Sequence, residues 1–168
     1  GQQKKARLTM VTISMLKKIS FLQDLPEHIL QKIGEVATIQ EFDAGTVIYE
    51  QDQPQSTFYM LVSGKVGLNS KSQKGITMTL DNVMPGRIFG VPALLSDSRG
   101  SFTAVCSEPS TVIKVSGRDM RDLFTQNFEI GHIVMRKMVK MYKSRRDMHT
   151  EQFLKFLKTH PEIRKLQD

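Results

Sequence analysis

The chain has 168 residues, of which 39% are hydrophobic and 24% are charged, and its formal net charge is +7. This length and composition predict one domain with a substantial core and some length left for flanking helices. No apolar run approaches the roughly 20 residues of a membrane-spanning helix, and the single cysteine, Cys106, excludes an internal disulfide framework and a Cys-rich metal site. We therefore expect a cytoplasmic protein without a membrane span.

The positive charge is concentrated at the two ends of the sequence. Residues 1–18 contain five Lys or Arg and no acid, and residues 131–168 contain ten Lys or Arg against four Asp or Glu. Residues 19–130 are therefore net acidic. Basic ends attract nucleic acid or an anionic partner. A solvated helix face explains the same charges, so both interpretations stay open.

Residues 8–40 have the apolar spacing of helices, and Pro26, a residue suited to the first turn of a helix, divides them into two. The apolar positions are Leu16, Ile19, Leu22, Leu25, Ile29, Leu30 and Ile33. From Thr38 the period shortens to that of strands separated by turn residues. The predicted strands lie within 39–42, 47–49, 58–62, 66–68, 76–80, 101–105 and 111–115. Short strands at this spacing predict a small sandwich or barrel.

Helical signals return at Ser116, which begins a short helix, and a longer amphipathic pattern follows. Its apolar residues recur at near-heptad spacing with Lys and Arg between them; they are Ile130, Val134, Met138, Met141 and Met148. We therefore predict a helical segment over residues 1–40, a strand-rich body over 41–116 and C-terminal helices over 117–168.

Several spaced motifs resemble those of cyclic-nucleotide-binding domains, over about residues 15–145. The motifs are Phe21-Leu22-Gln23-Asp24-Leu25-Pro26, Phe42-x-x-Gly45-x-x-Ile48, Phe58-Tyr59-Met60-Leu61-Val62-Ser63-Gly64-Lys65-Val66 and Phe89-Gly90-x-x-Ala93-Leu94-Leu95. The resemblance implies a mainly β fold: an antiparallel, jelly-roll-like β-roll with N-terminal helices and a long C-terminal helix. It also implies a regulatory, ligand-sensing function in signal transduction or transcription regulation.

In that family the phosphate-binding turn runs from Phe-Gly-Glu-x-Ala to Arg-x-Ala-Thr/Ser, so the resemblance places the candidate ligand site within Phe89–Ala104. Its candidate residues are Phe89, Gly90, Val91, Ala93, Leu94, Arg99, Gly100, Ser101 and Thr103. The implied ligand is a small anion, cyclic AMP or another cyclic nucleotide, and the sequence indicates no other cofactor.

The turn departs from the family pattern where the chemistry is needed. Val91 stands at the Glu position and accepts no hydrogen bond, and Pro92 has no N–H to donate. If Thr103 matches the family's Thr, Gly100 occupies the Arg position; if the loop is one residue shorter, Arg99 does. We therefore expect weak or altered binding of cyclic nucleotides.

Two alternatives stay open. One is a genuine cyclic AMP or cyclic GMP receptor that uses Arg99 in the shifted register. The other is a ligand-free module that binds protein or nucleic acid through its basic ends.

The remaining expectations concern catalysis and partners. The four histidines have no metal-ligand spacing and no nucleophile motif occurs, so we expect no enzyme activity. The resemblance implies a homodimer through the helix at residues 129–148. The roughly 20 residues after this helix are too few for a helix-turn-helix. Nucleic acid is therefore expected as a partner only if a DNA-binding part lies outside this sequence.

Overall fold

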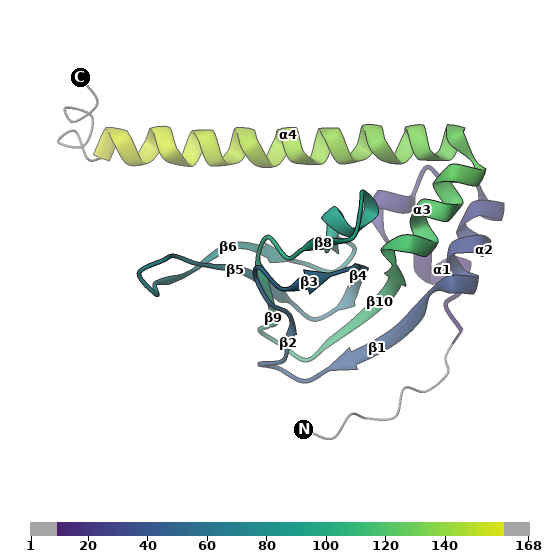
Figure 1. The fold of residues 1–168 in the computed structure, drawn as a ribbon, viewed down its shortest axis with the longest axis horizontal. Coiled ribbons are helices and arrows are strands. Elements are labelled where there is room, and N and C mark those ends of the chain that lie inside the picture. Colours follow the sequence, from purple (N-terminus) through teal and green to yellow (C-terminus); the bar gives the residue numbers. More distant parts are fainter. Residues whose placement is uncertain (1–9, 160–168) are drawn as a thin grey trace. The chain divides into compact units, whose positions relative to one another are not determined.

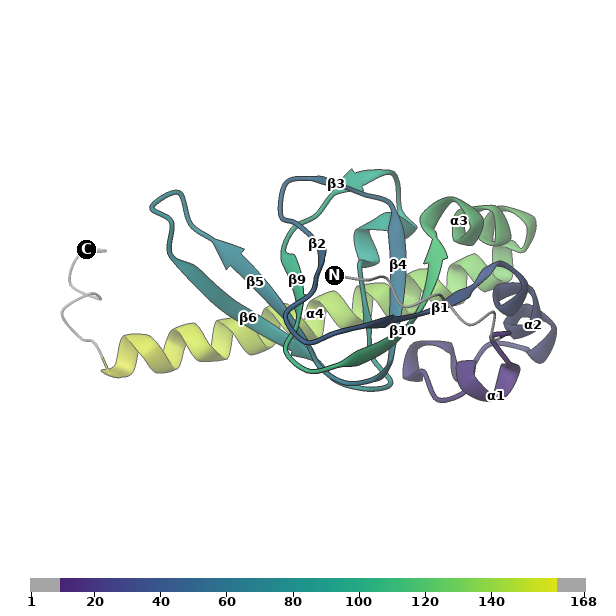
Figure 2. The same cartoon turned by 90° about the horizontal axis from the view of Figure 1, so that it is seen from below.

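The structure is a computed structural model that describes residues 10–159, and its strand-rich body lies between two helical segments in the sequence (Figures 1 and 2). The chain forms two units, Gly1–Phe128 and Glu129–Asp168. The first unit contains all the strands and the candidate site. The predicted fold, an antiparallel β-roll with helices before and after it, is confirmed.

The N-terminal helices are short. They are α1 (Ile13–Leu16), the 3-10 helix η1 (Ser20–Leu22) and α2 (Glu27–Val36). Pro26 precedes α2 as its N-cap, with φ −59° and ψ 148°, so it lies one position earlier than the first-turn place expected from the sequence. The helical segment ends before residue 40, because the first strand already begins at Thr38.

Ten strands follow: β1 (Thr38–Phe42), β2 (Val47–Tyr49), β3 (Pro54–Gln55), β4 (Thr57–Ser63), β5 (Val66–Lys71), β6 (Thr77–Val83), β7 (Ile88–Phe89), β8 (Ser98–Arg99), β9 (Thr103–Cys106) and β10 (Ser110–Ser116). They form one sheet of order β1-β10-β4-β7, a second of order β2-β9-β5-β6 and the small pair β3-β8. Each of the seven predicted strands is present. The sequence missed β3, β7 and β8, because a strand of two residues shows no alternation.

Two of these missed strands hold the ends of the segment that contains most of the candidate site residues. In the β4–β7 ladder Tyr59 lies opposite Phe89, and in the β3–β8 ladder Gln55 lies opposite Ser98. The segment from Phe89 to Ser98 is therefore anchored at both ends to one stretch of chain, residues 54–60.

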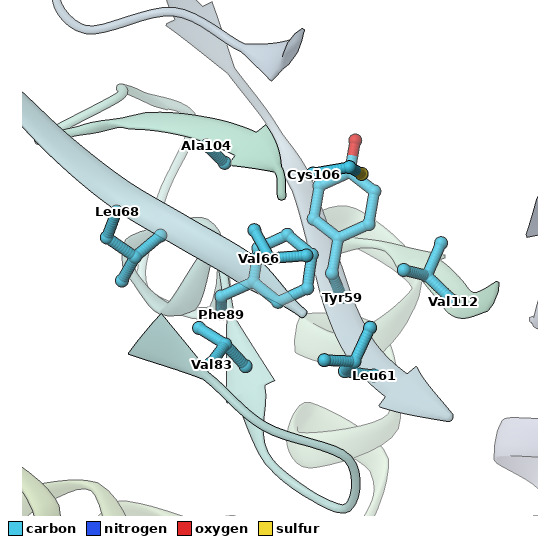
Figure 3. Packing of buried hydrophobic residues seen from close by; sticks show 9 residues of the cluster. All are labelled: Tyr59, Leu61, Val66, Leu68, Val83, Phe89, Ala104, Cys106 and Val112. Carbon is cyan, nitrogen blue, oxygen red and sulfur yellow. The ribbon is translucent and has the colours of Figure 1, made fainter. Parts of the chain in front are cut away.

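The core of the roll lies between the two larger sheets, where nine buried side chains gather (Figure 3). They are Tyr59, Leu61, Val66, Leu68, Val83, Phe89, Ala104, Cys106 and Val112. Phe89, the first candidate site residue, is only 2% exposed and belongs to this core. Its burial fixes the start of the turn that follows.

Two helices end the described chain: α3 (Gly117–Gln126) and α4 (Phe128–Thr159). Ser116 caps α3 by accepting a hydrogen bond from the backbone N–H of Asp119 at 3.0 Å, so the predicted helix start at Ser116 is confirmed. Within the described residues, no helix has the length and apolar character that crossing a bilayer requires.

Candidate functional site

The candidate site begins at a tight reversal after β7. Gly90 has φ +70°, and a Cβ built on it would lie 2.6 Å from the carbonyl oxygen of Thr57 and 3.1 Å from Nε2 of Gln55. Only glycine combines this backbone conformation with so close an approach. Gly90 therefore brings the next residues directly over β4.

A short 3-10 helix, η2 (Val91–Leu94), follows Gly90. Val91, Ala93 and Leu94 are all buried, so this helix presents apolar side chains to the protein interior. Pro92 donates no hydrogen bond, and the N–H of Ala93 is already bound to the carbonyl of Gly90 at 3.2 Å. Pro92 and Ala93 therefore offer no free N–H to an anion at this point of η2.

The guanidinium of Arg99 is hydrogen-bonded to the backbone of the turn before β3. It lies on β8 opposite Pro54, it is exposed, and its Nη1 donates to the backbone carbonyl of Asp52 at 2.6 Å. Asp52 is the one non-glycine residue with positive φ (+64°) in the part of the chain that the structure describes. The guanidinium of Arg99 therefore holds the turn that connects β2 to β3.

Gly100 joins the same turn through its backbone. Its N–H donates to the carbonyl of Gln53 at 2.9 Å, and its carbonyl accepts from the N–H of Asp52 at 2.8 Å. A Cβ at this position would lie 2.7 Å from the carbonyl oxygen of Glu50. The structure therefore leaves no room at residue 100 for an arginine without a shift of backbone.

The last candidates, Ser101 and Thr103, differ in their surroundings. Ser101 is exposed, whereas Thr103 is half-buried and its hydroxyl accepts a hydrogen bond from the backbone N–H of Gln51 at 3.0 Å. Phe102, between them, packs against the core. The Thr103 hydroxyl is thus engaged in holding β9 to the strand edge at Gln51.

An aromatic stack lies beneath the turn. The rings of Tyr59 and Phe89 are 4.9 Å apart and tilted by only 10°, and the ring of Tyr49 lies 5.9 Å from that of Tyr59. Burial raises the pKa of the Tyr59 hydroxyl, and the hydrogen bond with Thr57 opposes this shift less strongly. The hydroxyl is therefore protonated and uncharged at neutral pH.

On its other side the turn contacts α3. Arg121 donates from Nη1 to the carbonyl of Ala93 at 2.6 Å and from Nη2 to Oδ1 of Asp97 at 3.0 Å. A Cβ on Gly117 would overlap the same Ala93 carbonyl and would lie 2.9 Å from its carbon atom. The helix and the turn are in direct backbone contact at this point.

The sequence did not single out four residues that shape this site: Gln55, Ser98, Gly117 and Arg121. Gln55 is 6% exposed and donates to the carbonyl of Thr57 at 2.5 Å. The hydroxyl oxygen of Ser98 is buried without a hydrogen-bond partner among the described atoms. Gln55 and Ser98 lie in strands of two residues, which show no alternation. Gly117 and Arg121 contact Ala93, which is distant in the sequence, so no local pattern marks them.

Comparison with known proteins identifies the fold family. Residues 39–127, which are more than half of the chain, match the model of the cyclic nucleotide-binding domain. The chain belongs to the cyclic nucleotide-binding domain family. The resemblance seen in the sequence motifs is therefore confirmed.

Individual relatives in this family are distant. Human cGMP-dependent protein kinase 2 is 27% identical over 117 residues, which cover 69% of this chain but only 15% of the kinase. The chain therefore corresponds to a small part of that protein.

Two solved structures share the fold. The regulatory subunit of a cAMP-independent protein kinase A from Trypanosoma brucei matches 84% of this chain and 50% of its own, at TM-score 0.69 and 16% identity. The sensor domain of the transcriptional regulator DNR from Pseudomonas aeruginosa matches 80% of this chain and 90% of its own, at TM-score 0.68 and 20% identity.

The contact between the turn and α3 predicts the effect of Gly117→Ala. Replacing a helical glycine by alanine ordinarily stabilises a helix by up to about 1 kcal/mol. Here the added methyl overlaps the Ala93 backbone, so we expect the free energy of unfolding to fall by about 1–3 kcal/mol. Urea denaturation measures this difference.

The exposed position Asp122 in the same helix provides the control, because Asp122→Ala adds no such contact and is expected to change stability by about 0.5 kcal/mol or less. A Gly117→Ala protein as stable as the wild type would contradict the close approach of η2 to α3.

Proposed function

We propose that this domain of the cyclic nucleotide-binding family is a regulatory module whose turn binds cyclic nucleotides weakly or in an altered way. The observation that carries the proposal is the 2.6 Å bond from Arg99 to the carbonyl of Asp52. This bond directs the cation of the loop to a backbone carbonyl, although a cyclic phosphate needs that cation for itself.

The neighbouring residues support the same proposal. Val91 supplies no acceptor for a ribose hydroxyl, Pro92 supplies no N–H, and Gly100 is closed in by the backbone of Glu50. Charge-assisted hydrogen bonds contribute about 1.5–3 kcal/mol each. The loss of two of them weakens binding by about two to four decades, which takes the dissociation constant of a micromolar ligand to about 0.1–10 mM.

The cAMP-independent protein kinase A subunit of Trypanosoma brucei is a structural neighbour of this chain, so the fold is compatible with regulation that does not depend on cyclic AMP. We propose that regulation by this domain likewise does not depend on cyclic AMP.

The second candidate function is a genuine cyclic AMP or cyclic GMP receptor. In that case Arg99 would leave the Asp52 carbonyl and turn toward the phosphate. Arg99 is exposed, so breaking its present bond costs less than breaking a buried one. This alternative predicts that Arg99 is indispensable for binding.

Titration calorimetry with cyclic AMP and cyclic GMP separates these two functions. We expect no binding tighter than about 0.1 mM for either nucleotide, in both the wild type and Arg99→Ala. Arg87→Ala is the matched control, because the Arg87 guanidinium lies near Asp81 and Asn82 and not at the turn. Submicromolar binding that disappears in Arg99→Ala alone would replace our proposal by the receptor function.

A third candidate is an interaction module that uses the basic charge of α4, which has eight Lys or Arg against three Asp or Glu. The N-terminal cations Lys4, Lys5 and Arg7 lie outside the described residues. Binding of duplex DNA with a steep dependence on salt would support this function, and no binding at low salt would remove it. Dimerisation through residues 129–148 stays a prediction, which sedimentation velocity tests.

A further inference from the structure

Arg121 makes two hydrogen bonds across the contact between α3 and the turn. Its Nη1 reaches the carbonyl of Ala93 at 2.6 Å, and its Nη2 reaches the carboxylate of Asp97 at 3.0 Å. The planar guanidinium has parallel donors, so one side chain holds both η2 and the loop that follows it.

The two bonds differ in their shielding from solvent. The Arg121 side chain is 25% exposed and that of Asp97 is 77% exposed, so the ion pair alone contributes little. Ala93 is fully buried. The bond to the Ala93 carbonyl is therefore the stronger link, since a buried carbonyl left unpaired is costly.

Gly117 brings the helix close enough for this bond to form. Its N–H donates to the carbonyl of Ser56 at 2.8 Å, and its missing side chain lets the Ala93 carbonyl approach the first turn of α3. Arg121 follows one turn later on the same helix. The Ala93 carbonyl thus lies close to the first turn of α3 at Gly117 and accepts a hydrogen bond from the second turn at Arg121.

We propose that Arg121 is a positioning residue that joins the turn and α3 into one unit without any ligand. Its relevance to sensing rests on the proposed regulatory function, whereas the mechanical link stands on the contacts alone. Any change in the turn then reaches α3 through Arg121 and Gly117.

Hydrogen exchange measured by mass spectrometry on the whole chain, without nucleotide, tests this proposal. We expect amides in residues 91–97 and in residues 117–124 to exchange at least about tenfold faster in Arg121→Ala. Amides of β4 and β10 are expected to keep their wild-type exchange rates and serve as the internal reference for global stability. Arg121→Lys keeps the charge but loses the paired donors, so an intermediate acceleration is expected.

Arg118→Ala is the matched control, because Arg118 is an exposed arginine of the same helix and is expected to leave both segments unchanged. If Arg121→Ala fails to fold, Arg121→Lys and Gly117→Ala, which pushes the Ala93 carbonyl away, must each accelerate both segments. Unchanged exchange would overturn the proposal, as would acceleration of the turn alone or an equal effect of Arg118→Ala. The exchange rates are measured without nucleotide, so tight nucleotide binding in calorimetry would refute the proposed function and leave the result of this test unchanged.

Discussion

The approach of the Ala93 carbonyl to Gly117 is the contact on which the candidate site depends. A residue with a side chain at position 117 would collide with that backbone, and a helix farther away would put Arg121 out of reach of its two acceptors. Because η2 is fixed at this point, the segment before it is drawn over β4 and the segment after it continues into β8. The position of the turn is thus set by protein backbone on both sides.

The polar groups of the turn are also bonded within the protein. The guanidinium of Arg99, the hydroxyl of Thr103 and both backbone groups of Gly100 are bound to the single stretch of chain from Gln51 to Gln53. A ligand that required these groups would have to compete with short intramolecular bonds that cost no translational entropy to form. The altered residues and the existing hydrogen bonds therefore favour the same conclusion: the conformation of the turn is fixed by contacts within the protein and not by a ligand.

The amino-acid sequence predicts the fold well because the fold is encoded in local patterns. Strand alternation from Thr38 onward and the helix start at Ser116 both act over a few residues, and the structure has strands and a helix at these places. The site is harder to predict. Whether Arg99 points to a pocket depends on a register of one residue, and the partner of Arg121 lies 28 residues earlier in the chain, so neither is marked by a local pattern.

The turn is held by intramolecular contacts, and we propose that it offers little to a cyclic phosphate. The most direct measurement is an NMR titration of the ¹⁵N-labelled domain with cyclic AMP, following the amides of Val91, Gly100 and Ser101. We predict fast-exchange shifts that do not saturate below about 0.1 mM cyclic AMP. Saturable shifts of these three amides at micromolar nucleotide would contradict it.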